Sequence, residues 1–303
     1  MGRDYQPQEF TRSDANRNET PLEHGTIAKS PSGVEMFQGF GRTGDLPAPI
    51  TDRLVEPRHT YKLRGRIVQL RSSELATMIE VGKFRAIDLD DLREFCYHGD
   101  KKLMRSDIDS LIRQKLVQIK AIPSDERSPR RLLTLTVTGR RVLRKTKSVR
   151  DDQVLYHGFG QPHDVHHDAG LYRLYQKAMY PIERVGGRNL RIVLDYELKK
   201  RVNRDLAKLA PDSSPAAREH IASRHELRLV NGKIPIPDVR IEYETAEGDR
   251  AHLDLELVTK NYGLPQLLEK ARAGFPMFAY ASEVSRLRRI LDERELTAEI
   301  LSL

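Results

Sequence analysis

The sequence contains a single cysteine, Cys96, and no long run of apolar residues. One cysteine excludes an internal disulfide framework and suits a reducing cytoplasm. Neither a membrane-spanning segment nor the apolar core of a signal peptide is evident, so we expect a cytoplasmic protein without a membrane partner. Apolar residues make up only 38% of the 303 residues. Several stretches are nevertheless well patterned, which predicts folded cores.

Hydrophobic periodicity is scarce in residues 1–60, which are rich in Gly, Pro, Ser, Asn and charge. A segment of this composition buries too little apolar surface to fold by itself. We therefore expect residues 1–60 to form a disordered or loosely attached tail. Two domains are expected to follow it, over residues 61–150 and 151–303.

Positive charge is what the chain has in excess. The net charge is +8 and the isoelectric point is about 9.5. This balance favours a polyanionic partner such as DNA or RNA.

The spacing of apolar residues predicts three helices, over residues 72–87, 88–97 and 101–117. Ser72 and Ser73 suit the cap of the first helix, and His98-Gly99 ends the second. Residues 117–143 then predict a strand, a polar turn, a second strand and a closing helix. This order resembles the winged helix-turn-helix of bacterial DNA-binding proteins.

Basic residues are concentrated on the third helix and the wing of this unit. We expect these to bind DNA: Lys101, Lys102, Arg105, Arg113 and Lys115 on the helix, and Arg127, Arg130 and Arg131 at the wing tip. A helix in the major groove of double-stranded DNA, with a basic wing over the backbone, would use both sets. The alternative is a winged helix that serves as a scaffold for protein contacts.

Residues 234–260 predict two strands joined by a glycine-containing turn. Alternation with period two places Asp238, Asp254 and Glu256 together on the face opposite the apolar residues. Such carboxylates repel one another unless a cation lies between them, and a hard metal ion is the usual solution. The alternative is the ordinary acidic, solvated face of a hairpin.

The pair Pro237-Asp238, followed by Asp254-Leu255-Glu256, resembles the PD-(D/E)xK nuclease core, which has the restriction-endonuclease-like fold. Glu256 stands where that pattern has a lysine. Lys270 on the following helix, or Lys260, would supply the cation instead. The resemblance implies an α/β (α+β) chain and Mg²⁺ or Mn²⁺ as cofactor, whereas a chain that does not cut DNA would need no cofactor. The implied catalytic residues are Asp238, Asp254, Glu256 and Lys270, of which the three acids would hold the metal.

Residues 190–201 predict a strand that runs into charge, and 263–280 predict a helix. At the strand end, Asp195 or Glu197 would add a carboxylate to the acidic site, or would simply lie exposed there.

The densest group of metal-capable side chains lies in residues 157–168. On a helix, His163 and His167 share one face. With Asp168 they form an alternative metal site of the kind that zinc or another transition metal prefers, as in HD-type phosphohydrolases. The structural alternative is a capped helix whose Leu171, Leu174 and Tyr175 pack inward, and a third is contact with nucleic acid.

Taken in order, these motifs resemble the replication-relaxation proteins of plasmids and integrative elements, from Tyr61 to Tyr280. The residues that carry this resemblance are His163–Leu171, Pro237-Asp238, Asp254-Leu255-Glu256 with Thr259, and Lys270–Tyr280. The acid pair runs Asp then Glu here, where the family normally has Glu then Asp. The resemblance implies a protein that binds the DNA of a mobile element and nicks it. Its expected protein partners are a second copy of the same chain, in a homodimer, or replication and transfer proteins. The rival is a non-catalytic regulator or accessory factor with a degenerate nuclease fold.

Overall fold

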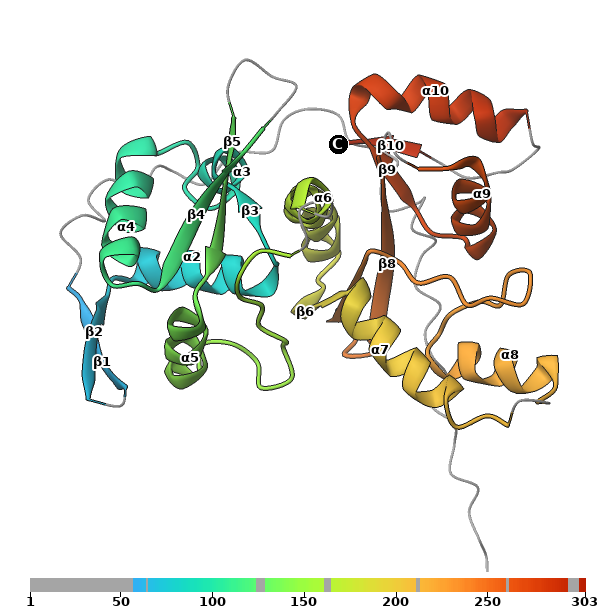
Figure 1. The fold of residues 1–303 in the computed structure, drawn as a ribbon, viewed down its shortest axis with the longest axis horizontal. Coiled ribbons are helices and arrows are strands. Elements are labelled where there is room, and N and C mark those ends of the chain that lie inside the picture. The colour runs from blue at the N-terminus through green and yellow to red at the C-terminus, as the bar shows by residue number, and fades with distance from the viewer. Residues whose placement is uncertain are drawn as a thin grey trace, which may run out of the picture.

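The computed structural model describes residues 57–63, 65–123, 129–160, 165–210, 213–259, 262–293 and 300–303. The chain is a mixed α/β protein in which both parts contain helices and a sheet (Figure 1). Residues 1–56 of the predicted tail lie outside the described residues. Strand β1 already begins at His59, just before the predicted domain boundary.

The N-terminal part contains the helices and strands that the sequence predicts, in the same order. The first helix ends at Lys83 and the third at Arg113, however, and not at residues 87 and 117, which lie in strands. Its elements are β1 (His59–Leu63), β2 (Arg66–Leu70), α2 (Ser72–Lys83), β3 (Ile87–Asp88), α3 (Leu89–Phe95), α4 (Lys101–Arg113), β4 (Val117–Ile122), β5 (Arg130–Leu135) and α5 (Val137–Thr146). Strands β3, β5 and β4 form an antiparallel sheet in that order. The β1–β2 hairpin and the short β3 were not predicted, since they are brief and carry little periodicity.

Local side-chain contacts explain where these helices begin and end. Asp88 and Asp100 cap α3 and α4 by accepting the backbone N–H groups of Asp90 and Leu103, at 2.8 and 2.9 Å. The predicted cap at the Ser72–Ser73 pair is wrong, because both serines lie inside the first turn of α2. There, Glu74 accepts the backbone N–H of the N-cap residue at 2.8 Å.

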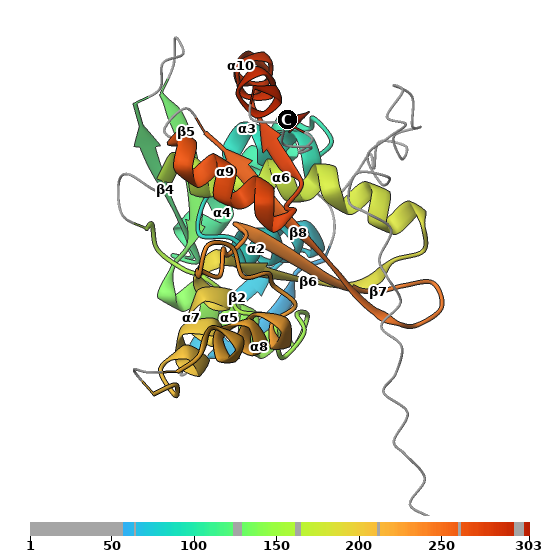
Figure 2. The ribbon, with the colours of Figure 1, turned by 90° about the vertical axis from the view of Figure 1, so that its right-hand side faces the viewer.

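The C-terminal part contains one sheet with helices on both faces. Its elements are α6 (Val165–Arg184), β6 (Arg188–Leu194), α7 (Asp195–Leu206), α8 (Pro215–Arg224), β7 (Val239–Glu244), β8 (Arg250–Val258), α9 (Leu264–Ala273), β9 (Met277–Ala279), α10 (Ala281–Asp292) and β10 (Ile300–Ser302). The strand order is β10-β9-β8-β7-β6; β6, β7 and β8 are antiparallel, and β8, β9 and β10 are parallel. Helix α6 covers one face, and α7, α9 and α10 lie on the other (Figure 2).

Two boundaries in this part differ from the sequence prediction. The predicted strand over 190–201 ends at Leu194, and Asp195 and Glu197 lie in the first turn of α7, where acidic side chains suit the helix dipole. The predicted helix over 263–280 ends at Gly274, which adopts a positive φ of 82°. The chain then enters β9, because Met277 and Ala279 pack in the apolar cluster beneath α9.

The apolar residues of the β7–β8 hairpin share one face, as predicted. Val239 pairs with Leu255 and Ile241 pairs with Leu253, so the apolar side chains share the face that α6 covers. At the end of the hairpin away from its turn, the opposite face is not exposed to solvent. The alternative prediction of an ordinary acidic, solvated face is therefore wrong at that end. Glu256 is fully buried there, and Asp238 is only 8% exposed.

Helix α6 is buried on two sides and joins the two parts into one core. Tyr172 lies edge-on to Phe84 of the N-terminal part, with ring centroids 5.4 Å apart. On the other side, a Cβ placed on Gly170 would come within 2.7 Å of a methyl carbon of Leu257 in β8, so glycine permits the close approach of helix and sheet. The inward packing predicted for Leu171, Leu174 and Tyr175 is confirmed.

We expect Tyr172→Ala to lower the free energy of unfolding by about 3–5 kcal/mol, as truncation of a large buried aromatic side chain does. Because one apolar cluster spans both parts, unfolding is expected to remain a single transition. Tyr180→Ala is the matched control, since Tyr180 lies on the same helix but is 44% exposed. Urea denaturation followed by circular dichroism measures both. A loss in Tyr172→Ala no larger than that in the control would contradict this role of α6.

Candidate functional site

Asp238 lies just before β7, directly across from Glu256 of β8. Its backbone N–H donates to Glu256 Oε2 at 3.2 Å, and its own Oδ2 accepts the backbone N–H of Leu257 at 2.8 Å. The last backbone pair of the β7–β8 ladder is Val239 with Leu255, and these side-chain hydrogen bonds connect the two strands beyond it. Two carboxylates are thereby held side by side at a buried end of the sheet.

Glu256 is bound on its other oxygen by two residues that follow it in the chain. The Lys270 Nζ lies 2.7 Å from Glu256 Oε1, and the Tyr262 hydroxyl donates to the same oxygen. Lys270 also donates to the backbone carbonyl of Ile236, at 2.5 Å. Helix α9 turns Lys270 toward the sheet because Lys270 shares the helix face of the buried residues Leu267 and Ala271.

His167 reaches the acid pair from α6. Its Nε2 lies 3.1 Å from Asp238 Oδ2. Burial alone would lower the pKa of His167, but the hydrogen bond to Asp238 and the charges of Asp238, Asp168 and Glu256 outweigh it and raise the pKa to about 9. His167 is therefore an imidazolium at neutral pH. The two predicted metal sites thus meet here, because His167 comes from one and Asp238 from the other.

Burial raises the pKa of Glu256 to about 8, and the negative charge of Asp238 adds to the shift, whereas Lys270 opposes it. The cause is the cost of placing a second carboxylate charge beside Asp238 where water is excluded. His167 and Lys270 flank the pair on opposite sides and compensate this charge.

Asp254 shares the sheet face of Asp238 and Glu256 but does not join their contacts. Its two oxygens accept the guanidinium of Arg240 at 2.6 and 2.8 Å, directly across the ladder. Asp168 turns toward the N-terminal part, where its Oδ2 lies 3.7 Å from Arg85. His163 and Lys260, named in the sequence analysis, lie outside the described residues, as does Arg127.

The described residues do not fit the predicted Mg²⁺ or Mn²⁺ site. Across these residues, no three His, Cys, Asp or Glu side chains are grouped so as to hold a metal ion. Asp254 is bound by Arg240, and Glu256 Oε1 is bound by Lys270 and Tyr262. The carboxylates are neutralised by side chains of the chain itself.

Sequence reasoning missed two residues of this site. Arg240 had a usable signal, because pairing Val239 with Leu255 places Arg240 opposite Asp254, and opposite charges across a ladder attract. Tyr262 had none, since it follows β8 in a stretch without periodicity and meets Glu256 only through the path of the chain into α9.

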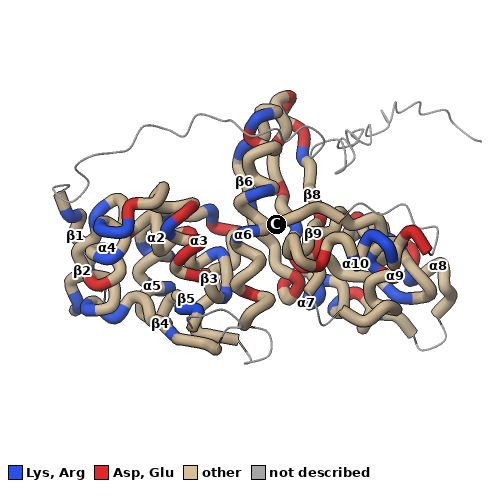
Figure 3. Tube along the Cα trace, turned by 90° about the horizontal axis from the view of Figure 1, so that it is seen from above, with Lys and Arg blue, Asp and Glu red and all other residues tan. Residues whose placement is uncertain are grey.

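The basic residues predicted to bind DNA fall into three groups. Lys101, Lys102, Arg105 and Arg113 are exposed on α4, and Figure 3 shows this charge together with that of the neighbouring β1–β2 hairpin. Lys115 is exposed but lies in the turn after α4, with a positive φ of 58°, and so does not belong to the helix as predicted. At the wing, Arg131 is exposed, whereas Arg130 is engaged with Asp88 at 2.7 Å.

The chain matches no family model, and no curated protein or solved structure is significantly similar to it. No helix in the described part of the chain is both long and apolar enough to cross a membrane. Function is therefore inferred from the geometry of the chain itself.

Because the folded protein raises the pKa of His167 from 6.5 to about 9, it keeps a proton there that the unfolded chain releases. The stabilisation is complete below pH 6.5 and is lost as the pH rises to about 9. We expect His167→Gln to reduce the fall in the free energy of unfolding over this range by about 3 kcal/mol. The pKa of Glu256 is raised from 4.5 to about 8, so Glu256 also lowers the free energy of unfolding as the pH rises, beginning at a lower pH than His167.

Urea denaturation at pH 6, 7.5 and 9 measures this difference. His220→Gln is the control, because His220 is exposed on α8 and should follow the wild type. Curves for His167→Gln and wild type that stay parallel over this range would rule out the imidazolium–Asp238 contact.

Proposed function

We propose that this chain is a cytoplasmic DNA-binding protein of a mobile genetic element, acting in its replication, relaxation or mobilisation. The observation that carries the proposal is the outer face of α4. Its exposed Lys101, Lys102, Arg105 and Arg113 form no ion pair with a carboxylate of the described residues. Four cations left to solvent on one helix suit the phosphates and base edges of a DNA groove.

The order of elements around α4 supports the same conclusion. Helices α2, α3 and α4 precede the β4–β5 hairpin, which is the order of a winged helix-turn-helix. In this reading α4 enters the major groove, and Arg131 of the hairpin contacts the backbone. The resemblance to replication-relaxation proteins supplies the biological setting, with a homodimer or replication and transfer proteins as partners.

We expect the double variant Lys102→Gln with Arg105→Gln to weaken duplex binding for all sequences. The slope of log K against log salt should fall by about 1.8 in magnitude, because each lost phosphate contact contributes about 0.9. Fluorescence anisotropy of labelled duplexes over a salt series measures it.

The control is Arg184→Gln with Arg250→Gln, which removes the same charge from exposed positions of the C-terminal part. Equal losses in both double variants would show only an effect of net charge. If the wild-type protein binds no duplex, α4 is instead a surface for protein contacts.

A second candidate function is phosphodiester cleavage at the Asp238–Glu256 pair. The chain order α6, β6, β7, β8, α9, interrupted by α7 and α8, is the order expected of a restriction-endonuclease-like core. Burial of two carboxylates and a lysine is costly for stability. Strongly perturbed pKa values, such as those of Glu256 and His167, are concentrated at functional sites.

The contacts within the site favour binding without cutting. Each carboxylate already has a cation of the chain beside it: His167 for Asp238, Lys270 for Glu256 and Arg240 for Asp254. A site whose charges are balanced internally suits a regulator or accessory factor that retains a nuclease-like core. We therefore place DNA binding first and cleavage second.

Asp238→Asn separates the two candidates. We expect supercoiled plasmid to remain intact with the wild-type protein and Mg²⁺ or Mn²⁺, as in chelator, and duplex affinity to be unchanged by the substitution. Gel electrophoresis of the plasmid and anisotropy measure the two properties. Nicking that needs the metal and is lost in Asp238→Asn, but retained in Asp249→Asn at the exposed hairpin turn, would establish the nuclease instead.

A further inference from the structure

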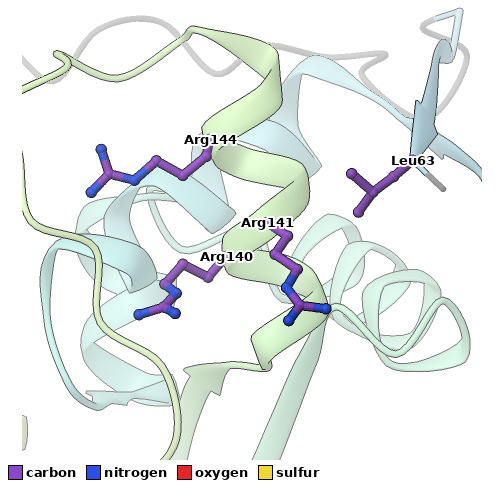
Figure 4. Close-up of a pocket in the computed structure, with 4 residues that line it drawn as sticks. All are labelled: Leu63, Arg140, Arg141 and Arg144. Atoms are coloured by element: carbon purple, nitrogen blue, oxygen red, sulfur yellow. The ribbon is translucent and has the colours of Figure 1, made fainter.

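A hollow of about 380 Å³ lies over helix α5, away from the acid pair. It is lined by Leu63 of β1 and by three arginines of α5, Arg140, Arg141 and Arg144. Figure 4 shows Arg140 and Arg144 extending to one side of the helix and Arg141 to the other, with Leu63 facing them from β1. One apolar side chain and three arginines therefore line the space, and the guanidinium groups spread over both sides of the helix.

The segment of the chain that carries these arginines has charge of one sign. The sequence from Arg127 to Arg150 contains no aspartate or glutamate. Arg140 and Arg141 form no ion pair with a carboxylate of the described residues, and Arg144 donates to a backbone carbonyl, that of Asp151, at 3.3 Å. Burial and the charge of Arg140 lower the pKa of the nearby His157, as a local positive potential does.

Helix stability does not account for Arg140 and Arg141. Both lie in the N-terminal half of α5, whose first turn carries no acid, and the positive end of a helix dipole disfavours cations. Arg144 and Lys145, in the last turn, do suit the dipole. Arg140 and Arg141 therefore add nothing to the dipole interaction, and their guanidinium groups are placed at the surface where they can meet an anion.

The start of α5 is pressed against the turn that follows α4. The hydroxyl of Thr136 donates to the carbonyl of Lys115 at 2.7 Å, and its backbone N–H donates to Leu116 at 2.9 Å. A Cβ on Gly139 would lie 2.0 Å from the Leu116 carbonyl oxygen, so only glycine allows this contact. The hollow is therefore adjacent to the C-terminal end of α4, where Arg113 and Lys115 are exposed.

We propose that the hollow over α5 binds phosphates of the DNA backbone, and so extends the contact of α4 along the strand that leaves the groove. This rests on the proposed DNA-binding function. Guanidinium groups pair with phosphate oxygens with two parallel hydrogen bonds, and Leu63 offers an apolar wall to the deoxyribose. The contact carries no base information, so it adds affinity for every sequence.

The test is the salt dependence of duplex binding by the full chain. Arg140→Gln with Arg141→Gln should reduce the magnitude of the slope of log K against log salt by about 1.8, equally for duplexes of different sequence. Both side chains lie at the surface, and circular dichroism checks that the variant folds. The matched control is Arg184→Gln with Arg250→Gln, which should leave the slope near that of the wild type.

The outcomes separate this inference from the function on which it rests. If the slope of log K against log salt is unchanged by Arg140→Gln with Arg141→Gln but falls in the α4 double variant, the α5 contact alone is overturned. Equal changes in the α5 variant and the control also overturn it, because bulk charge then explains the effect. Absence of duplex binding by the wild-type protein overturns the proposed function itself.

Discussion

The burial of α6 on two sides is the constraint on which the rest of the structure depends. The helix packs Tyr172 against Phe84 of the N-terminal part, while Gly170 lets its backbone approach Leu257 of the sheet. The rotation of the helix is fixed by these two contacts. Successive residues are consequently sent to different places: His167 to the acid pair, and Asp168 toward Arg85. One apolar cluster spans both parts as a result.

The same packing explains the electrostatics of the candidate site. With α6 on one face of the sheet and α9 on the other, the end of β8 is closed to water, and Glu256 is fully buried. Charges in such a place persist only when they are paired and hydrogen-bonded. His167 and Lys270 arrive from the two covering helices and meet this requirement. Asp254, nearer the open part of the hairpin, is paired within the sheet by Arg240.

The basic surface has the opposite character. On α4 and at the start of α5 the arginines and lysines are left to solvent without carboxylate partners among the described residues, whereas the acid pair is internally neutralised. The cations of α4 and of the start of α5 are thus left unpaired among the described residues, whereas the charges at the sheet end of the C-terminal part are paired. Because of this contrast, we assign recognition of a polyanion to α4 and α5 and treat catalysis at the acid pair as the second candidate function.

The sequence by itself determined the local structure of most elements. Period-two alternation predicted that the apolar residues of β7 and β8 share one face, and helical spacing predicted α2, α3 and α4, because these patterns depend on neighbours along the chain. Only the tertiary structure decided which acids meet. Asp238 meets Glu256 and His167, and Glu256 meets Lys270, because helices distant in sequence close over one end of the sheet. Asp254 lies on the same face but is bound by Arg240 instead. Such contacts depend on packing between elements, for which a single sequence carries no periodic signal.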